Sequence, residues 1–393
     1  MSEFQSSNFT KENGGTSNLV GKTELTSPYF FVPPSGTTAE RPQSCARGTL
    51  RFNTDVGTLE VFRGDTIGWE YIEKREGQYL GDVLGDPSTA NGSNAGNGTR
   101  MCILGGYSGP VLDTIDYITI TTLGDAKDFG DLTNGRYSAG ALGNSTRGFS
   151  VGGYNPGLTN QINVFTFASK GDATDVADLV KIVAYSSELS NEVRGVVLGG
   201  TTPGTPVINN IQYFSIFGNT VTDSVDFGDL TYSSLGLAAC ASTTRGVTTG
   251  GSPGVNTMNF ITIMTTGDAT DYGDLSFSTQ QHMACSNATR GLISGGGTPG
   301  SMVNNIDFIT IATTGDAQDF GDLLTTDTRD GASGSSKTRG IVSAGGDPYA
   351  SPYPKTNTIN FVEISTTGNT SDFGDLTVAR NHMAGCSNGH GGL

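Results

Sequence analysis

The sequence has little of several residue types on which specific chemistry depends. Its 393 residues include one tryptophan, three histidines and five cysteines, and no two cysteines form a CxxC pair. The chain therefore has no zinc-binding signature. It also has no run of 18 apolar residues, so we expect no transmembrane helix. The N-terminal residues lack the basic start and apolar stretch of a secretory signal, and none is expected.

Basic residues are also scarce. The chain has 22 Lys and Arg against 38 Asp and Glu, a formal net charge of −16, and its basic residues are scattered. A surface that binds duplex nucleic acid needs clustered Lys and Arg. We therefore expect binding neither to nucleic acid nor to anionic membranes.

What the chain does have is glycine, 58 residues of it, and a repeat. The repeat reads [TV]-R-G-x-x-x-G-G, a loop, [IM]-[DNQ] with alternating apolar residues, and a segment close to D-F-G-D-L. Its arginines lie 45 to 51 residues apart, at Arg100, Arg147, Arg194, Arg245, Arg290 and Arg339. A period of this length with four short strand signals predicts the blades of a β-propeller.

One repeat, from Gln281 to Leu323, illustrates the four expected strands a to d. Strand a is HMACSNA, strand b is TRGLISGGG, strand c is NNIDFITIATTG and strand d is QDFGDL. The paired glycines that end strand b fit a backbone turn with positive φ or a close approach of chains. The apolar residue that opens strand d is expected to wedge between blades: Phe129, Val176, Phe227, Tyr272, Phe320 and Phe373. Val176 therefore predicts that the second blade is the least well packed.

This order of strands resembles the kelch repeat over about 295 residues. The Gly-Gly pair stands where that family has it, whereas the usual tryptophan of strand d is replaced by Phe, Tyr or Val. The resemblance implies an all-β fold, a six-bladed kelch-like β-propeller at 99–393. A closed ring leaves no sheet edge free, so we expect the C-terminal strand at 379–388 to become strand a of the first blade. The alternative is that residues 88–96 take that place.

Paired aspartates recur in strand d of every repeat, for example Asp128 and Asp131. Carboxylate pairs suit acid–base catalysis or calcium, but six equivalent copies favour a structural role. We expect one Asp of each pair to hold a turn through backbone amides and the other to neutralise the repeated Arg. Calcium binding stays open. No catalytic residue, cofactor or metal site is predicted, since His282, His382 and His390 fall in different blades or past them. Cys240, Cys285 and Cys386 are repeat equivalents and are expected to be buried, unbonded and far apart.

The N-terminal quarter is organised differently. Residues 1–47 are predicted to form an extended arm and a proline-containing connector, and 79–98 form a Gly/Asn/Ser linker. Between them, residues 48–78 form a small module whose three strands make a β-meander with turns at 53–57 and 64–68. So few residues cannot bury a sufficient core. The module must therefore pack on the arm, the propeller or another subunit, with Trp69 as the candidate contact residue. We expect the arm and the module to contact another protein chain and not the propeller alone.

A second resemblance concerns PSGTTAERP (34–42), Gly48 to Asp55 and Leu59 to Trp69. These segments look like a small β-module common in structural proteins of tailed bacteriophages, and kelch-like repeats after such a module resemble virion proteins of marine cyanobacterial phages. The resemblance implies a non-enzymatic virion protein: a tail fibre, a tail-associated adhesin or a head decoration. Residues 1–78 would dock to other virion proteins, and the propeller would be displayed for host binding; homo-oligomerisation stays open.

The alternative function is a carbohydrate-binding or glycan-active propeller. An enzyme should place unlike polar residues from different blades at the axial mouth, whereas a scaffold should have near-identical residues there. Binding elements are expected in the loops between strands b and c. The longest of these, at 347–358, carries Tyr349 and Tyr353, which are further candidate binding residues. A solvated loop without function is the other interpretation of this segment.

Overall fold

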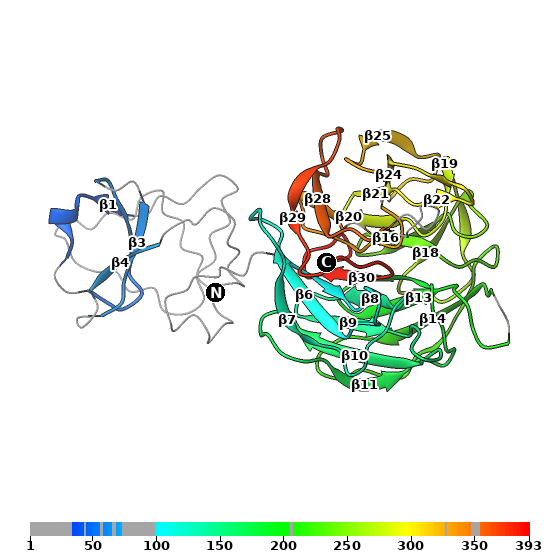
Figure 1. Ribbon diagram of the computed structural model, residues 1–393. Coiled ribbons are helices and arrows are strands. Elements are labelled where there is room, and N and C mark those ends of the chain that lie inside the picture. Colours follow the sequence, from blue (N-terminus) through cyan, green and yellow to red (C-terminus); the bar gives the residue numbers. More distant parts are fainter. Residues whose placement is uncertain are drawn as a thin grey trace, which may run out of the picture. The chain divides into compact units, whose positions relative to one another are not determined.

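The computed structural model (Figure 1) describes residues 34–42, 45–55, 58–64, 68–72, 99–204, 207–326, 328–343, 345–346 and 354–393. The chain divides into two compact units, unit 1 (Met1–Gly77) and unit 2 (Gln78–Leu393). The predicted arm at 1–30, the linker at 79–98, Tyr349 and Tyr353 lie outside the described residues. Within the described ranges, no helix is long and apolar enough to cross a membrane.

Unit 1 contains one four-stranded sheet, in the order β1-β2-β3-β4. Strands β2 (Leu50–Asn53), β3 (Thr58–Phe62) and β4 (Trp69–Ile72) form the antiparallel meander that the sequence predicts. Strand β1 (Ser35–Gly36) pairs with β2 in parallel and is followed by the 3₁₀ helix η1 (Thr38–Glu40). The segment predicted as an extended connector is therefore partly a component of the sheet.

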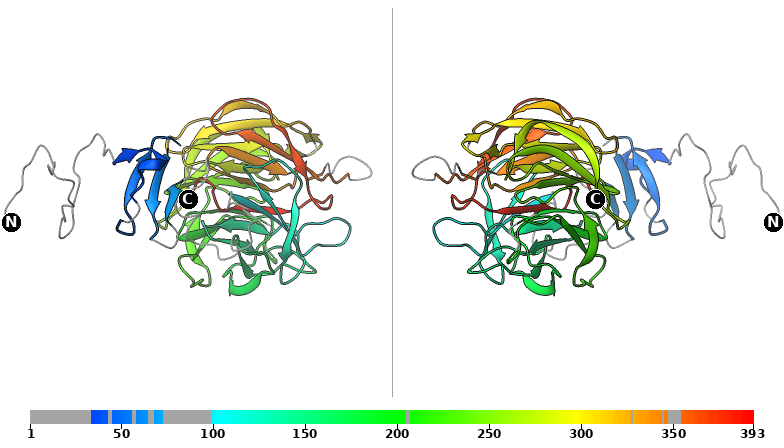
Figure 2. Two further views of the ribbon diagram at one scale, coloured as in Figure 1. Left: turned by 90° about the vertical axis from the view of Figure 1, so that its left-hand side faces the viewer. Right: turned by 90° about the vertical axis from the view of Figure 1, so that its right-hand side faces the viewer.

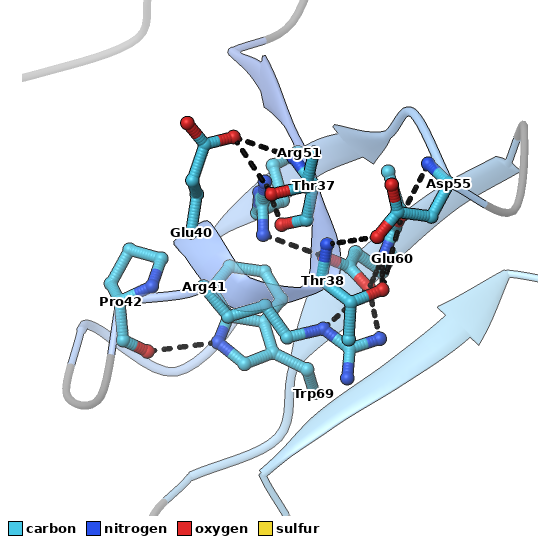
Figure 3. A network of polar contacts seen from close by, with 10 residues as sticks. Thr37, Thr38, Glu40, Arg41, Pro42, Arg51, Asp55, Glu60 and Trp69 are labelled. Atoms are coloured by element: carbon cyan, nitrogen blue, oxygen red, sulfur yellow. Dashed lines mark hydrogen bonds and ion pairs between the residues drawn. The ribbon is translucent and has the colours of Figure 1, made fainter.

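A buried glutamate explains why this segment joins the sheet. Glu60 of β3 is fully buried, and its carboxylate accepts hydrogen bonds from Arg41 Nη2 at 2.6 Å and Asn53 Nδ2 at 3.1 Å. It also pairs with Arg51 Nη1 at 3.0 Å. Figure 3 shows the carboxylate lying between the sheet and the turn that carries Thr38 and Arg41. An unpaired buried charge is costly, so the arginine that follows η1 fixes the whole segment over this face.

The two faces of the meander differ in polarity. Cross-strand pairs place Arg51 opposite Glu60 on one face, and Phe62 opposite Trp69 on the same face. The other face carries Leu50 opposite Val61 and Phe52 opposite Leu59. On this second face Leu50 is 45% exposed and Leu59 is 37% exposed. The apolar side of the small sheet is therefore the one left open, whereas the polar side is covered by the chain itself.

The described residues of unit 2 form six four-stranded antiparallel sheets and one short hairpin. In chain order the first four sheets are β30 (Ala384–Ser387), β5 (Arg100–Leu104), β6 (Thr114–Thr119), β7 (Lys127–Asp131); β8 (Gly140–Gly143), β9 (Arg147–Val151), β10 (Gln161–Thr166), β11 (Thr174–Asp178); β12 (Ser187–Ser190), β13 (Arg194–Leu198), β14 (Asn210–Ser215), β15 (Val225–Asp229); and β16 (Ala238–Ala241), β17 (Arg245–Thr249), β18 (Val255–Thr262), β19 (Thr270–Thr279). The last two are β20 (Met283–Ser286), β21 (Arg290–Ser294), β24 (Asn305–Thr310), β25 (Gln318–Asp322); and β26 (Ser333–Ser335), β27 (Arg339–Ser343), β28 (Thr358–Glu363), β29 (Ser371–Asp375). The hairpin is β22 (Gly297–Thr298) and β23 (Ser301–Met302).

The first strands of the six sheets meet one another in a cycle. Strand β30 contacts β8, β8 contacts β12, and the succession continues through β16, β20 and β26 back to β30. Figure 1 shows these strands towards the middle and the last strands, such as β7, β11 and β25, towards the outside; Figure 2 gives the side views. The C-terminal strand β30 pairs with β5, as the sequence analysis expects, and Cys386 lies opposite Cys102. Residues from the end of the repeat region therefore complete the first sheet.

The repeated arginines link each sheet to the next, but not in the way expected. Each guanidinium donates to backbone carbonyls near the end of the third strand of the following repeat, and the last one, Arg339, reaches the Ile120 carbonyl oxygen of the first repeat at 2.9 Å. The other five acceptors are at Phe167, Ile216, Ile263, Ile311 and Ile364. Each guanidinium also lies over an aromatic ring, for example Arg194 4.0 Å from the Tyr213 ring centre. The expectation that the paired aspartates neutralise these arginines is wrong.

A side chain in the turn before each last strand supplies a second link, and in four repeats it is the aspartate of a Gly-Asp turn. Asp172 Oδ1 accepts the backbone amide of Asp131 in the preceding repeat at 3.0 Å, and Asp125 Oδ1 accepts that of Asp375, which joins the last repeat to the first. Equivalent bonds join Asp178 to Asp223, Asp229 to Asp268, Asp274 to Asp316 and Asp322 to Asn369. The side chain that holds the amide is thus the turn residue, not a member of the Asp pair as expected.

Apolar clusters fill the spaces between neighbouring repeats. In five repeats an aromatic residue of the third strand packs edge-on against the aromatic residue that opens the fourth, as in Tyr213 and Phe227 with ring centres 5.7 Å apart. The second repeat has Val164 and Val176 there, and Val176 is 39% exposed. Its cluster contains Phe149 of β9 instead, whose ring lies 6.0 Å from that of Phe214. Val176 is therefore not wedged between sheets as expected, and Phe149 occupies the place of the missing rings. That the second blade is the least well packed stays a prediction.

Candidate binding face at the mouth of the central cavity

Six residues that precede the first strands form a closed backbone ring. All six have left-handed backbone conformation, with φ between 49° and 64°: Ser138, Tyr185, Gly236, Gln281, Asp330 and His382. The amide of Tyr185 donates to the carbonyl of Ser138 at 2.9 Å, and the amide of Ser138 donates to that of His382 at 2.9 Å. The same bond recurs around the ring, and the Met383 amide completes it by donating to Asp330. The backbone is thus repeated six times, whereas the side chains differ at every position.

The polar side chains of this ring contact one another. Gln281 Nε2 donates to Asp330 Oδ1 at 2.6 Å, and His382 Nδ1 lies 3.3 Å from the same oxygen. The Ser138 hydroxyl lies 3.3 Å from His382 Nδ1. Arg329 donates to the side-chain oxygen of Gln281, and its Nε lies 4.0 Å from Asp330 Oδ2. The carboxylate is therefore engaged by neighbouring donors on several sides.

Aromatic residues extend this cluster over the first three repeats. The Tyr137 ring lies 5.3 Å from that of Tyr154, 6.1 Å from that of Tyr107 and 5.8 Å from that of His382. Tyr185 meets His382 edge-on at 5.8 Å. Burial raises the pKa of Tyr137 and of Tyr185, and the neighbouring tyrosines raise that of Tyr137 further. The hydroxyls of Tyr137 and Tyr185 are therefore held in their neutral form.

Behind the ring lies a cavity of about 170 Å³, lined by the six first strands. Five of these strands have a small residue at the equivalent position, which is the second residue of each strand except β26, where it is the first: Ala141, Ala239, Ala284, Ser333 and Gly385. The sixth is Glu188, whose Oε1 accepts the Ser186 hydroxyl at 2.6 Å. Its carboxyl group packs against Gly140. A Cβ atom at position 140 would lie only 1.9 Å from Glu188 Cδ. Burial raises the pKa of Glu188 to about 7, opposed by bonds from Ser186 and the Ala141 amide.

Residues after β30 cross the opposite end of the cavity. His390 Nε2 lies 2.9 Å from the Gly143 carbonyl oxygen and 3.4 Å from the Ser190 hydroxyl, at the ends of β8 and β12. Gly391 packs against backbone carbonyls at the ends of β16 and β20, so closely that a Cβ there would lie 2.4 Å from the Ala241 oxygen. The cavity therefore faces the polar ring at one end and this segment at the other.

Several predicted features lie away from this face. The members of the Asp pairs are almost all exposed, and the described part of the chain contains no group of three or more His, Cys, Asp or Glu residues suited to a metal ion. Cys240, Cys285 and Cys386 are buried and free, as predicted. They are not far apart as expected, since their strands β16, β20 and β30 all line one cavity. Of the histidines, only His382 belongs to the mouth; His282 Nε2 lies 2.8 Å from the Thr249 hydroxyl, and burial lowers its pKa to about 3.

Trp69 is half-buried within unit 1. Its indole Nε1 donates to the Pro42 carbonyl oxygen at 3.0 Å, and the Arg51 guanidinium lies 5.7 Å from its ring centre. It belongs to the polar, self-covered face of the sheet, so its contact with another chain stays a prediction. The apolar face around Leu50 and Leu59 was not singled out from sequence, although its strict alternation with polar residues is a signal for it.

No protein-family model matches the chain, and no curated protein matches it either.

Proposed function

We propose that this chain is a non-enzymatic virion structural protein of a tailed bacteriophage, with unit 2 a six-bladed kelch-like propeller. Unit 1 would attach the chain to the particle as part of a tail fibre, a tail-associated adhesin or a head decoration. The propeller would be displayed to bind a host molecule or another partner. One observation carries the proposal. The chain divides into two units: a small sheet with an exposed apolar face, and a repeat unit whose polar mouth has a different residue in every repeat.

The propeller assignment is supported by three independent sets of links that join the last repeat to the first. They are the Arg339 bond to the Ile120 carbonyl, the Asp125 bond to the Asp375 amide, and the backbone ring at the mouth. The pairing of β30 with β5 adds a fourth. A cycle of sheets removes the free edges that an open array of strands would present to other chains.

Attachment through unit 1 is supported by its exposed apolar face. Monomeric sheets generally cover one face with their own core, yet here Leu50 and Leu59 are exposed and the covered face is the charged one. The partner surface should accordingly be apolar. This face, rather than Trp69 alone, is the one we expect to be buried in the particle.

The test compares three proteins during particle assembly. Deletion of residues 1–77 should leave folded unit 2 that no longer enters particles, and Leu59→Asp in the full chain should reduce incorporation strongly because it places a charge in an apolar contact. Thr54→Asp, at an exposed position of the turn that follows β2, is the matched control. Incorporation is measured by mass spectrometry of purified particles. Normal incorporation of the deletion protein would refute attachment through unit 1.

A second candidate function is a carbohydrate-binding propeller. It is favoured by the six unlike residues of the mouth, because a pure scaffold would be expected to repeat the same side chain there. Hydrolysis of a glycosidic bond usually needs two suitably spaced carboxyl groups. Among the described residues the ring itself contributes one, Asp330, while Glu188 lies within the cavity and is bonded to Ser186. We therefore favour binding over hydrolysis.

A further inference from the structure

The tyrosines of the mouth lie at a position where the residue type differs between repeats. Tyr107 and Tyr154 each follow the Gly-Gly pair of their repeats, where the next repeats have Thr201 and Ser252. Tyr107 is 38% exposed and Tyr154 is 37% exposed, although both are large aromatic residues. Tyr137 lies between them and joins the two rings into one surface. The fold does not require these rings, since other repeats form the same turn without them.

The charges around this surface restrict what it can bind. Lys355 Nζ already lies 4.3 Å from the Tyr107 ring centre, so a cationic ligand would have to displace it. Asp330 is engaged by Gln281 and lies within 3.3 Å of His382, and the chain carries a net charge of −16, which disfavours an anion. What remains accessible is the partly exposed rings of Tyr107 and Tyr154, beside hydroxyl, amide and imidazole groups.

We propose that this surface is a binding site for a neutral saccharide, with Tyr107, Tyr137 and Tyr154 as its aromatic platform. The C–H face of a pyranose is apolar and packs on tyrosine rings, while its hydroxyls exchange hydrogen bonds with the tyrosine hydroxyls and with Ser138, Gln281 and His382. The inference rests on the proposed function, because it assigns the ligand class to the displayed propeller. A sugar of one or two residues matches the extent of three neighbouring rings.

The test uses the full-length protein on an array of neutral, sialylated and sulfated glycans, followed by NMR titration with the methyl glycoside of the best neutral ligand. Tyr107→Thr and Tyr154→Thr install the residue that the third repeat has at this position, so the turn should be retained. We expect each to weaken binding about tenfold, the loss usual for an aromatic anchor of a contact. The control is Phe217→Thr, which removes another exposed aromatic ring (66% exposed) from the segment after β14.

A preference for neutral glycans that both tyrosine variants reduce, with the control unchanged, supports the site. Absence of binding to any neutral glycan, a preference for charged glycans, or equal affinity of the Tyr107→Thr/Tyr154→Thr double variant would overturn it. So would selection of peptides that bind the wild-type mouth while glycans do not. Particle assembly is scored separately with the wild-type protein. Normal incorporation of a wild-type protein that binds no sugar counts against this site alone, whereas sugar binding by a wild-type protein that does not enter particles counts against the virion role.

Discussion

Two glutamates, Glu60 in unit 1 and Glu188 in unit 2, have pKa values shifted in opposite directions. Burial raises the pKa of Glu60, but hydrogen bonds from Arg41 and Asn53 and the charges of Arg41 and Arg51 outweigh it, so the pKa is lowered overall. Glu188 has only the Ser186 hydroxyl and the Ala141 amide as partners, and its pKa rises to about 7. Glu60 is thus a charged residue that holds unit 1 together, whereas Glu188 of unit 2 keeps its proton to a higher pH.

The difference reflects how each unit is held together. Unit 1 is small, so a single polar network around Glu60 determines whether the segment before β2 joins the sheet. Unit 2 repeats its stabilising contacts in every sheet, through apolar clusters and bonds to backbone groups. Glu188 contributes to none of these repeated links. It is tolerated by Gly140, the one glycine at the first position of the six first strands.

The largest effect should come from breaking the cycle of unit 2 while leaving unit 1 unchanged. Deletion of residues 379–393 removes β30 and exposes the edges of β5 and of its neighbours, so unit 2 should aggregate. Size-exclusion chromatography and thermal unfolding would reveal this. A soluble truncated protein with unaltered melting would show that β30 is dispensable.

Breaking the polar network around Glu60 should destabilise unit 1 and leave unit 2 unchanged. Glu60→Ala leaves Arg41 and Arg51 without their carboxylate and should destabilise unit 1 by about 3–5 kcal/mol, a range typical of broken buried ion pairs. Hydrogen exchange should increase in β1 to β4 and stay unchanged in unit 2. The exposed Glu40, whose carboxylate accepts hydrogen bonds from the amide and hydroxyl of Thr37, gives the control Glu40→Ala, for which we expect a much smaller loss of stability. Equal effects of the two substitutions would contradict the proposed role of Glu60.

The compensation in the second repeat can be tested by moving the rings. Phe149→Val should destabilise unit 2 by about 2–3 kcal/mol, since it leaves the cluster around Phe214 with a cavity. Adding Val164→Phe and Val176→Phe restores the aromatic pair of the other repeats and should recover part of the loss. Denaturant unfolding measures both steps. If the triple variant is less stable than Phe149→Val alone, the two packing solutions are not interchangeable.

The smallest effect concerns pH. Because the pKa of Glu188 is raised in the folded state, its contribution to stability is fully present below about pH 4.5 and is lost as pH rises through about 7. Glu188→Gln should therefore increase stability above pH 7 and change it little at pH 4.5. Glu60 has the opposite sign: its lowered pKa gives stability that is lost as pH falls. Melting temperatures across pH 4 to 9 distinguish the two glutamates, and a pH-independent effect of Glu188→Gln would refute the assignment.

Much of the strand pattern could be predicted because it depends on side chains that recur. The alternation in IDYITI and its copies gave the third strands, and the Gly-Gly pairs gave the ends of the second. The partners of Arg100 and its equivalents could not be predicted, because they are backbone carbonyls of another repeat and leave no trace in residue identity. The pairing of turn aspartates with a neighbouring repeat was hidden for the same reason.

The candidate site was missed for a different reason. Tyr349 and Tyr353 were predicted as binding residues because they lie in the longest loop between strands b and c. Tyr107 and Tyr154 instead lie in the short turns directly after Gly-Gly. Aligning the six repeats at that position would have revealed them as departures from Thr and Ser. Glu188 likewise stands out only when SELS is aligned with the small residues of the other first strands. Deviations within a repeat, rather than its consensus, carry the signal for function.

The left-handed ring at the mouth bears on how this chain tolerates mutation. A residue other than glycine in this conformation costs about 1–2 kcal/mol, and five of the six positions accept that cost. In a mutational scan selected only for folding, glycine should therefore be enriched at Ser138, Tyr185, Gln281, Asp330 and His382. The residues actually present there are a record of selection for something other than stability. The same ring offers six positions where side chains are exchanged without altering the backbone bonds between repeats, a fixed frame for variable recognition.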